Sequence, residues 1–167
     1  MDSNELNIIL SKVEALAREL DLKYHGCSQM TLKAIQEVLG LNDGAVFKAA
    51  SALAGGVARS GEVCGALLGA LMAVSLVYGR DKLEPTSTSK NYLKAMEVGY
   101  KVFDEFKAYF GSVRCRDIHM KLFNRVYNLR DSADLSEFVS SGAINKCADV
   151  VSVAARIATK AIIESKQ

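Results

Sequence analysis

The 167-residue chain is half apolar, which is enough material for one hydrophobic core, so we expect a single domain over residues 1–167. Its 21 basic and 19 acidic residues leave a net charge of +2 without a long basic run, which argues against a nucleic-acid partner. One proline among many alanine, leucine, lysine and glutamate residues predicts an all-α fold.

Apolar residues recur at helical spacing along most of the chain, and glycines mark where several helices end. We expect helices at about residues 3–21, 27–39, 43–54, 62–78, 89–110, 115–126 and 143–165, and a short one at 134–140. The polar segment 79–89, which holds the proline, is expected to be a connection that could shield or expose a site. Together these segments predict a compact bundle of about six or seven helices.

The helix at 62–78 is expected at the centre of the bundle because it is uncharged after its first residue and rich in small residues. Gly65 and Gly69, with neighbouring alanines, repeat every four residues, so another backbone can approach closely. The uncharged run 63–79 is shorter than the roughly 18 apolar residues of a membrane helix, so we expect no membrane span. The N-terminus opens with acidic residues rather than a secretion signal, which predicts a cytoplasmic protein.

The four cysteines are the candidate functional residues, because thiols in the cytoplasm usually serve as reactive groups, metal ligands or redox pairs. Each follows a glycine that ends a helix, and the four are Cys27, Cys64, Cys115 and Cys147. We expect all four near helix N-termini, where the macrodipole and free N–H groups favour a thiolate. This placement predicts lowered thiol pKa values, to which Arg59, Arg114 and Arg116 could contribute. The alternative is that the cysteines only pack in the core.

The spacing of the cysteines leaves more than one chemistry open. Intervals of 37, 51 and 32 residues contain no Cys-x-x-Cys motif, which excludes the thioredoxin and zinc-ribbon signatures. A site in which all four cysteines hold zinc or an iron–sulfur cluster is still allowed if the fold brings them together. His119, one turn after Cys115, could add a metal ligand, and His25, near Cys27, could deprotonate a thiol.

A glycine-bearing loop precedes Cys64. Gly55, Gly56 and Gly61, with Arg59 between them, could hold an anionic group of a cofactor through backbone N–H groups and the guanidinium. A flexible connection between two helices explains the same glycines, so both interpretations stay open.

Two segments carry a resemblance to a known family, namely His25-Gly26-Cys27-Ser28-Gln29 and the motif Cys64-Gly65-Ala66-Leu67-Leu68-Gly69. With Cys115 and Cys147 following in order, about residues 20–160 resemble the C_GCAxxG_C_C family, whose hallmark is a CGAxxG motif with three further cysteines. The resemblance implies a redox-active protein, often encoded near oxidoreductase or transporter genes, and defines neither a reaction nor a cysteine pairing. Some relatives look exported through a twin-arginine signal, which this sequence lacks.

We expect thiol–disulfide exchange or electron transfer through the four cysteines, in a thiol-dependent oxidoreductase or an accessory to one. Cys64 is the expected nucleophile and Cys27 its expected partner, because the loop, the helix start and the motif converge on Cys64. The alternatives are a metal-binding or iron–sulfur protein and a non-catalytic helical interaction protein. The expected partner is an oxidoreductase or another redox protein, and the chain could form a homodimer. Cysteine Cα atoms within about 7 Å would favour a disulfide, and four converging sulfurs a cluster.

Overall fold

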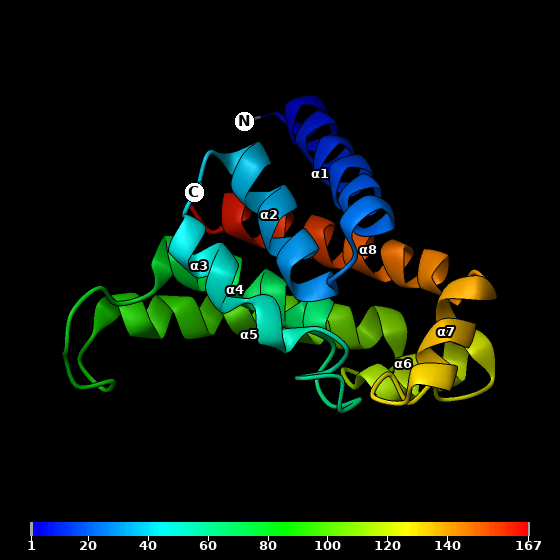
Figure 1. Cartoon of the computed structure of the whole chain (residues 1–167). Helices are drawn as coiled ribbons and strands as arrows, with labels where there is room; N and C mark the ends of the chain where they lie inside the picture. Colours follow the sequence, from blue (N-terminus) through cyan, green and yellow to red (C-terminus); the bar gives the residue numbers. More distant parts are fainter. Residues whose placement is uncertain (1, 167) are drawn as a thin grey trace.

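The computed structural model describes residues 2–166 and confirms the all-α fold (Figure 1). The described chain forms α1 (Ser3–Tyr24), α2 (Cys27–Leu39), α3 (Gly44–Ala49), the 3₁₀ turn η1 (Ser51–Leu53), α4 (Gly65–Tyr78), α5 (Lys90–Phe110), α6 (Cys115–Phe123), α7 (Ser132–Ser140) and α8 (Ala143–Glu164). These are eight α-helices, one in each of the eight expected segments, against about six or seven expected for the bundle.

Most helix ends follow from local sequence signals. Asp2 caps α1 in a capping box with Glu5, and α2 and α5 end at Gly40 and Gly111, which adopt left-handed conformations. Three predictions were too long. The segment 43–54 divides into α3 and η1, and α4 begins at Gly65 rather than at residue 62. Helix α6 ends three residues early because Asn124 turns into the left-handed region, with φ 55°.

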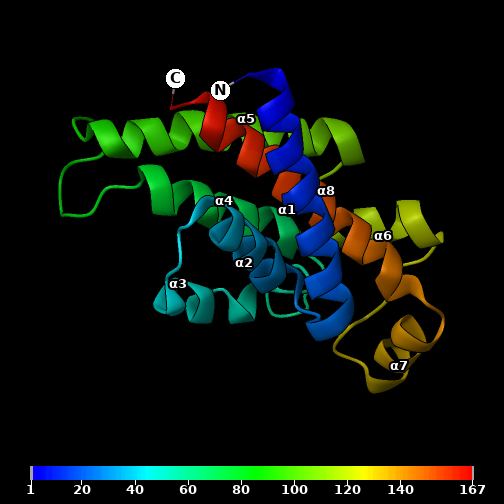
Figure 2. The ribbon, with the colours of Figure 1, turned by 90° about the horizontal axis from the view of Figure 1, so that it is seen from above.

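Helix α4 lies at the centre of the bundle and packs against α2, α5 and α8, while α1 packs against α2 and α8 (Figures 1 and 2). A Cβ atom on Gly69 would collide with the backbone carbonyl of Ser28, so the small residues of α4 do admit α2 closely, as predicted. Three alanines of α4, Ala66, Ala70 and Ala73, are fully buried at this centre.

The two ends of the molecule differ. Helices α6 and α7 lie together near the start of α8, whereas the connection 79–89 extends from the opposite end (Figures 1 and 2). That connection therefore cannot cover a site beside α6 and α7. Within residues 2–166, no helix is both long and apolar enough to cross a membrane.

Candidate functional site

All four cysteines border one cavity of about 320 Å³, and all four are free thiols. Cys27 and Cys115 begin α2 and α6, Cys64 directly precedes α4, and Cys147 lies in the second turn of α8. The end of α1, the loop before α4 and helix α7 complete the cavity wall. The structure thus brings together four residues that span most of the sequence.

The CGAxxG motif has a packing explanation at this cavity. Gly65 follows Cys64, and a Cβ atom at Gly65 would lie only 2.5 Å from the Sγ atom of Cys27. The missing side chain therefore leaves the space into which the Cys27 thiol fits, directly beside Cys64. Gly69, one turn later, makes the same kind of room for the backbone of α2 at Ser28. The two glycines therefore allow the first turns of α2 and α4 to pack closely against each other.

A short backbone pairing places Cys64 beside Cys115. Residues 63 and 114 form an isolated antiparallel bridge, and the N–H groups of Cys64 and Cys115 donate across it at 2.8 and 2.7 Å. Because alternate residues of paired segments share a face, both cysteine side chains project from the same side. They occupy diagonal positions, whose Cα atoms typically lie about 7–8 Å apart, which is long for a disulfide.

The loop before Cys64 is a left-handed turn. All residues from 55 to 59 have positive φ, including the non-glycine residues Val57, Ala58 and Arg59 with φ 64°, 48° and 59°. This conformation costs roughly 1–2 kcal/mol for each residue with a side chain. Arg116 holds the loop to α6 by donating to the carbonyls of Gly61 and Ser60 at 3.1 and 2.9 Å.

The loop has few free backbone N–H groups for the anion site that the sequence predicts there. The backbone N–H groups of residues 57–62 all donate to backbone carbonyls of residues 52–57, so they are already engaged. Gly56 is buried, and a Cβ atom there would lie 2.7 Å from the Cβ atom of Cys115, so this glycine serves close packing. Of the residues expected at the anion site, Gly55 and Arg59 line the cavity.

The prediction of lowered thiol pKa values is wrong. Burial, together with the proximity of the other cysteines, raises the pKa of Cys27, Cys64 and Cys115 to about 12, and the same causes raise that of Cys147. The N–H groups of Ala66 and Leu67, at the start of α4, do lower the pKa of Cys64, but burial outweighs them. The thiols are therefore protonated at neutral pH.

The four thiols differ in access. Cys64 and Cys115 are only 7% and 8% exposed, whereas Cys27 and Cys147 are half-buried. Cys27 lines the cavity, and burial is the main cause of its raised pKa. A partner molecule can therefore reach Cys27 and Cys147 more easily than the other two.

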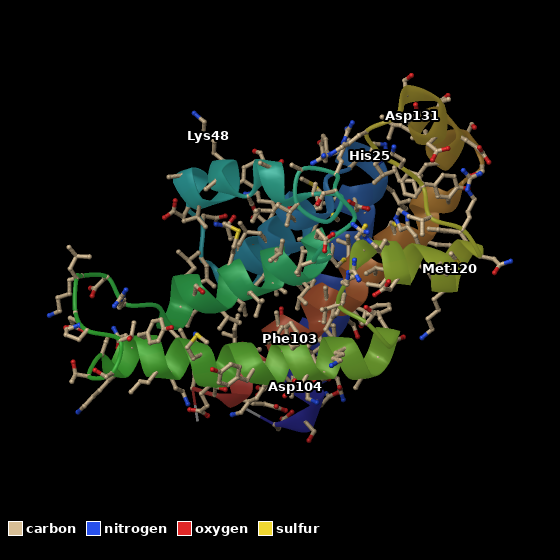
Figure 3. All side chains as sticks on the ribbon, turned by 90° about the horizontal axis from the view of Figure 1, so that it is seen from below. His25, Lys48, Phe103, Asp104, Met120 and Asp131 are labelled. Atoms are coloured by element: carbon tan, nitrogen blue, oxygen red, sulfur yellow. The ribbon has the colours of Figure 1, made fainter. Side chains whose placement is uncertain are left out.

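His119 lies between two of the thiols. Its Nε2 atom is 3.7 Å from the Sγ atom of Cys115 and 3.9 Å from that of Cys147. The sequence predicted the first neighbour and missed the second, because Cys147 comes from α8. Burial lowers the pKa of His119 to about 4, so the ring is neutral, and it stacks on Phe138 with centroids 5.4 Å apart. The next residue, Met120, points away from the molecule (Figure 3).

The metal alternative gains no geometric support. Among residues 2–166, no three histidine, cysteine, aspartate or glutamate side chains form a group that could hold a metal ion. The four cysteines line the cavity from four different parts of the chain.

Asp21 is the cavity residue that the sequence analysis missed. It is 3% exposed, and its Oδ1 atom has no hydrogen-bond partner among the described residues. Burial raises its pKa to about 6, although the nearby His25 opposes this effect. The available signal was its position, because Asp21 continues the buried row formed by Leu10, Val13 and Ala17 in α1. A carboxyl group on such a row is unusual.

His25 lies at the end of α1, next to the loop that leads into α4 (Figure 3). Its Nδ1 atom is 2.9 Å from the backbone carbonyl oxygen of Asp21. The side chain is exposed and also lines the cavity, so it stands at the cavity entrance. His25 and Cys27 therefore line the same cavity, as their nearness in the sequence predicted, but no contact between the imidazole and the thiol is observed.

Comparison with known proteins identifies a family. A family model described as "Putative redox-active protein (C_GCAxxG_C_C)" matches residues 25–161, a span that contains all four cysteines and His119. Asp21 lies before that span. No curated protein and no solved structure matches the chain.

Proposed function

The chain belongs to the C_GCAxxG_C_C family, and we propose that its four-cysteine cavity is a thiol–disulfide exchange centre. The observation that carries the proposal is the gathering of four free thiols around one cavity, two of them accessible and two buried. An accessible thiol can meet a partner, and a buried neighbour can then complete a disulfide. The partner would be an oxidoreductase or another redox protein.

Cys27 and Cys64 are the proposed exchanging pair. The Cys27 thiol occupies the space that the missing side chain of Gly65 leaves, and Gly65 directly follows Cys64. Cys64 and Cys115, by contrast, occupy diagonal positions across their bridge. Exposure favours Cys27 as the thiol that attacks the partner and Cys64 as the second thiol, the reverse of the roles expected from the sequence.

The reaction transfers two electrons. The sulfur of Cys27 attacks one sulfur of a partner disulfide, whose S–S bond breaks and releases one partner thiol. The sulfur of Cys64 then attacks Cys27 in the mixed disulfide and releases the second partner thiol. The pair loses two electrons and two protons, and the partner gains both. Because the pKa of both thiols is raised to about 12, the reaction needs a proton acceptor close to them.

Counting free thiols tests this proposal. Anaerobically purified protein would be treated with bis(hydroxyethyl) disulfide, alkylated, and weighed by mass spectrometry. We expect the wild type to lose two thiols to an internal disulfide and Cys64→Ser to stop at one mixed disulfide on Cys27. Cys147→Ser should still form the internal disulfide. Four free thiols in the wild type would contradict the proposal.

The same preparation distinguishes the metal alternative. Zinc or iron measured at a fixed ratio to protein, with cysteines that resist alkylation until a chelator is added, would support four cysteine ligands instead. A metal-free protein with reactive thiols supports the exchange reaction.

A further inference from the structure

We infer that Asp21 accepts and returns the thiol protons during exchange in the four-cysteine cavity. The inference rests on the proposed function and adds a residue from outside the matched family span to the reacting groups. It is carried by the position of the carboxyl group, which lines the same cavity as all four cysteines.

The carboxyl group of Asp21 lines the same cavity as the thiols. Its charge raises the pKa of Cys27, Cys64 and Cys147, so it acts on thiols from three different helix starts. It is 3% exposed, and its Oδ1 atom has no partner among the described residues. Burying a carboxylate oxygen without a partner is unfavourable, and an apolar residue would suit this row of α1 better. A role in proton transfer explains why a carboxyl group occupies the row.

The other groups around the cavity are less suited to this role. His25, from the end of α1, and Arg59, from the loop before α4, stand at the entrance and are exposed. His119, from α6, faces Cys115 and Cys147, and its pKa of about 4 makes it a weak base. Burial raises the pKa of Asp21 to about 6, which makes its carboxylate a better proton acceptor than an exposed one.

The proton balance is complete with Asp21 alone. The Cys27 thiol gives its proton to the ionised carboxyl group as its sulfur attacks the partner disulfide. The departing partner thiolate takes this proton, which returns Asp21 to its ionised form. The same transfer then serves Cys64 and the second departing thiolate, so two protons leave with two electrons.

The test is the rate of internal disulfide formation with bis(hydroxyethyl) disulfide, measured from pH 5 to pH 9 in the wild type and in Asp21→Asn. Glu19→Gln, an exposed change on the same helix, is the matched control. We expect Asp21→Asn to react roughly 10²-fold more slowly at neutral pH and to lose an inflection near pH 6. Glu19→Gln should react like the wild type.

If Asp21 acted only through its charge and transferred no proton, Asp21→Asn would change the rate in the opposite direction. Removing the negative charge of Asp21 would lower the thiol pKa values and accelerate the reaction. A rate for Asp21→Asn that equals or exceeds the wild-type rate would therefore overturn the inference while leaving the proposed function intact. A wild type that forms no disulfide would overturn both. Circular dichroism of Asp21→Asn confirms that a slow variant is folded.

Discussion

Asp21 has a second consequence, which concerns stability. Its pKa is about 6 in the folded protein against an ordinary value of 3.8, so the folded state binds more protons than the unfolded state between these values. The free energy of unfolding therefore falls as the pH rises from about 4 to about 6. Above pH 6 the ionised Asp21 destabilises the folded protein by its full amount. Ionising a carboxyl group with this raised pKa in the folded protein costs about 3 kcal/mol.

We predict that Asp21→Asn unfolds at the same urea concentration as the wild type near pH 4 and becomes more stable than it by about 3 kcal/mol at pH 7. Urea unfolding of both proteins at several pH values measures the difference. A difference that does not change with pH would show that Asp21 is not a buried acid with a raised pKa.

Some features of the site could be predicted from the sequence, and others could not. The four cysteines could be predicted as a group because each follows a glycine and lies near the start of a helix. The direction of their pKa shifts could not, because a helix N-terminus is visible in the sequence and burial is not. Asp21 was missed since its effect depends on thiols from distant segments.

At the scale of elements, the approach of α2 to α4 depends on the absence of two side chains. An exposed helical glycine usually gains up to about 1 kcal/mol when replaced by alanine. At Gly65 the new Cβ atom would instead lie 2.5 Å from the Cys27 sulfur and 2.9 Å from the carbonyl oxygen of Leu53. We predict that Gly65→Ala lowers the free energy of unfolding by about 1–3 kcal/mol.

Gly99→Ala, in α5, is the matched control. Its nearest new contact would be an ordinary 3.7 Å to a methyl group of Leu71, so this variant should be as stable as the wild type or more stable. Thermal unfolding of the two variants measures the contrast. Equal effects of both changes would contradict the close packing at Gly65.

The left-handed loop before α4 offers another prediction. Val57 has φ 64°, a conformation that is unfavourable for a β-branched side chain, and it is 39% exposed. We predict that Val57→Gly raises the free energy of unfolding by about 1 kcal/mol, because glycine adopts this conformation without strain. Chemical denaturation checks this. A destabilised variant would mean that the side chain of Val57 contributes more than its backbone costs.

The helices were largely predictable, and this loop was not. Apolar spacing and caps indicate where α1, α2, α5 and α8 run, because those signals act within a few residues. The loop takes its conformation from contacts with residues far along the chain, above all the side chain of Arg116 in α6. The glycines alone fitted either a flexible connection or an anion site.

At the scale of the whole molecule, the cavity is built by segments that span the chain from the end of α1 to the first half of α8. A disulfide between Cys27 and Cys64 would close the chain from residue 27 to residue 64 and restrict the unfolded state. We predict that oxidation raises the free energy of unfolding by about 3–4 kcal/mol. Cys27→Ser should unfold identically with and without oxidant, and an equal gain in this variant would contradict the assignment.

Peptide mapping of the oxidised protein by mass spectrometry, before and after treatment with a thiol reductant, tests whether Cys27 and Cys64 form the exchanging pair. We expect a linked peptide pair containing Cys27 and Cys64, which separates on reduction. Four unlinked cysteines, or a link that does not join Cys27 to Cys64, would contradict this assignment.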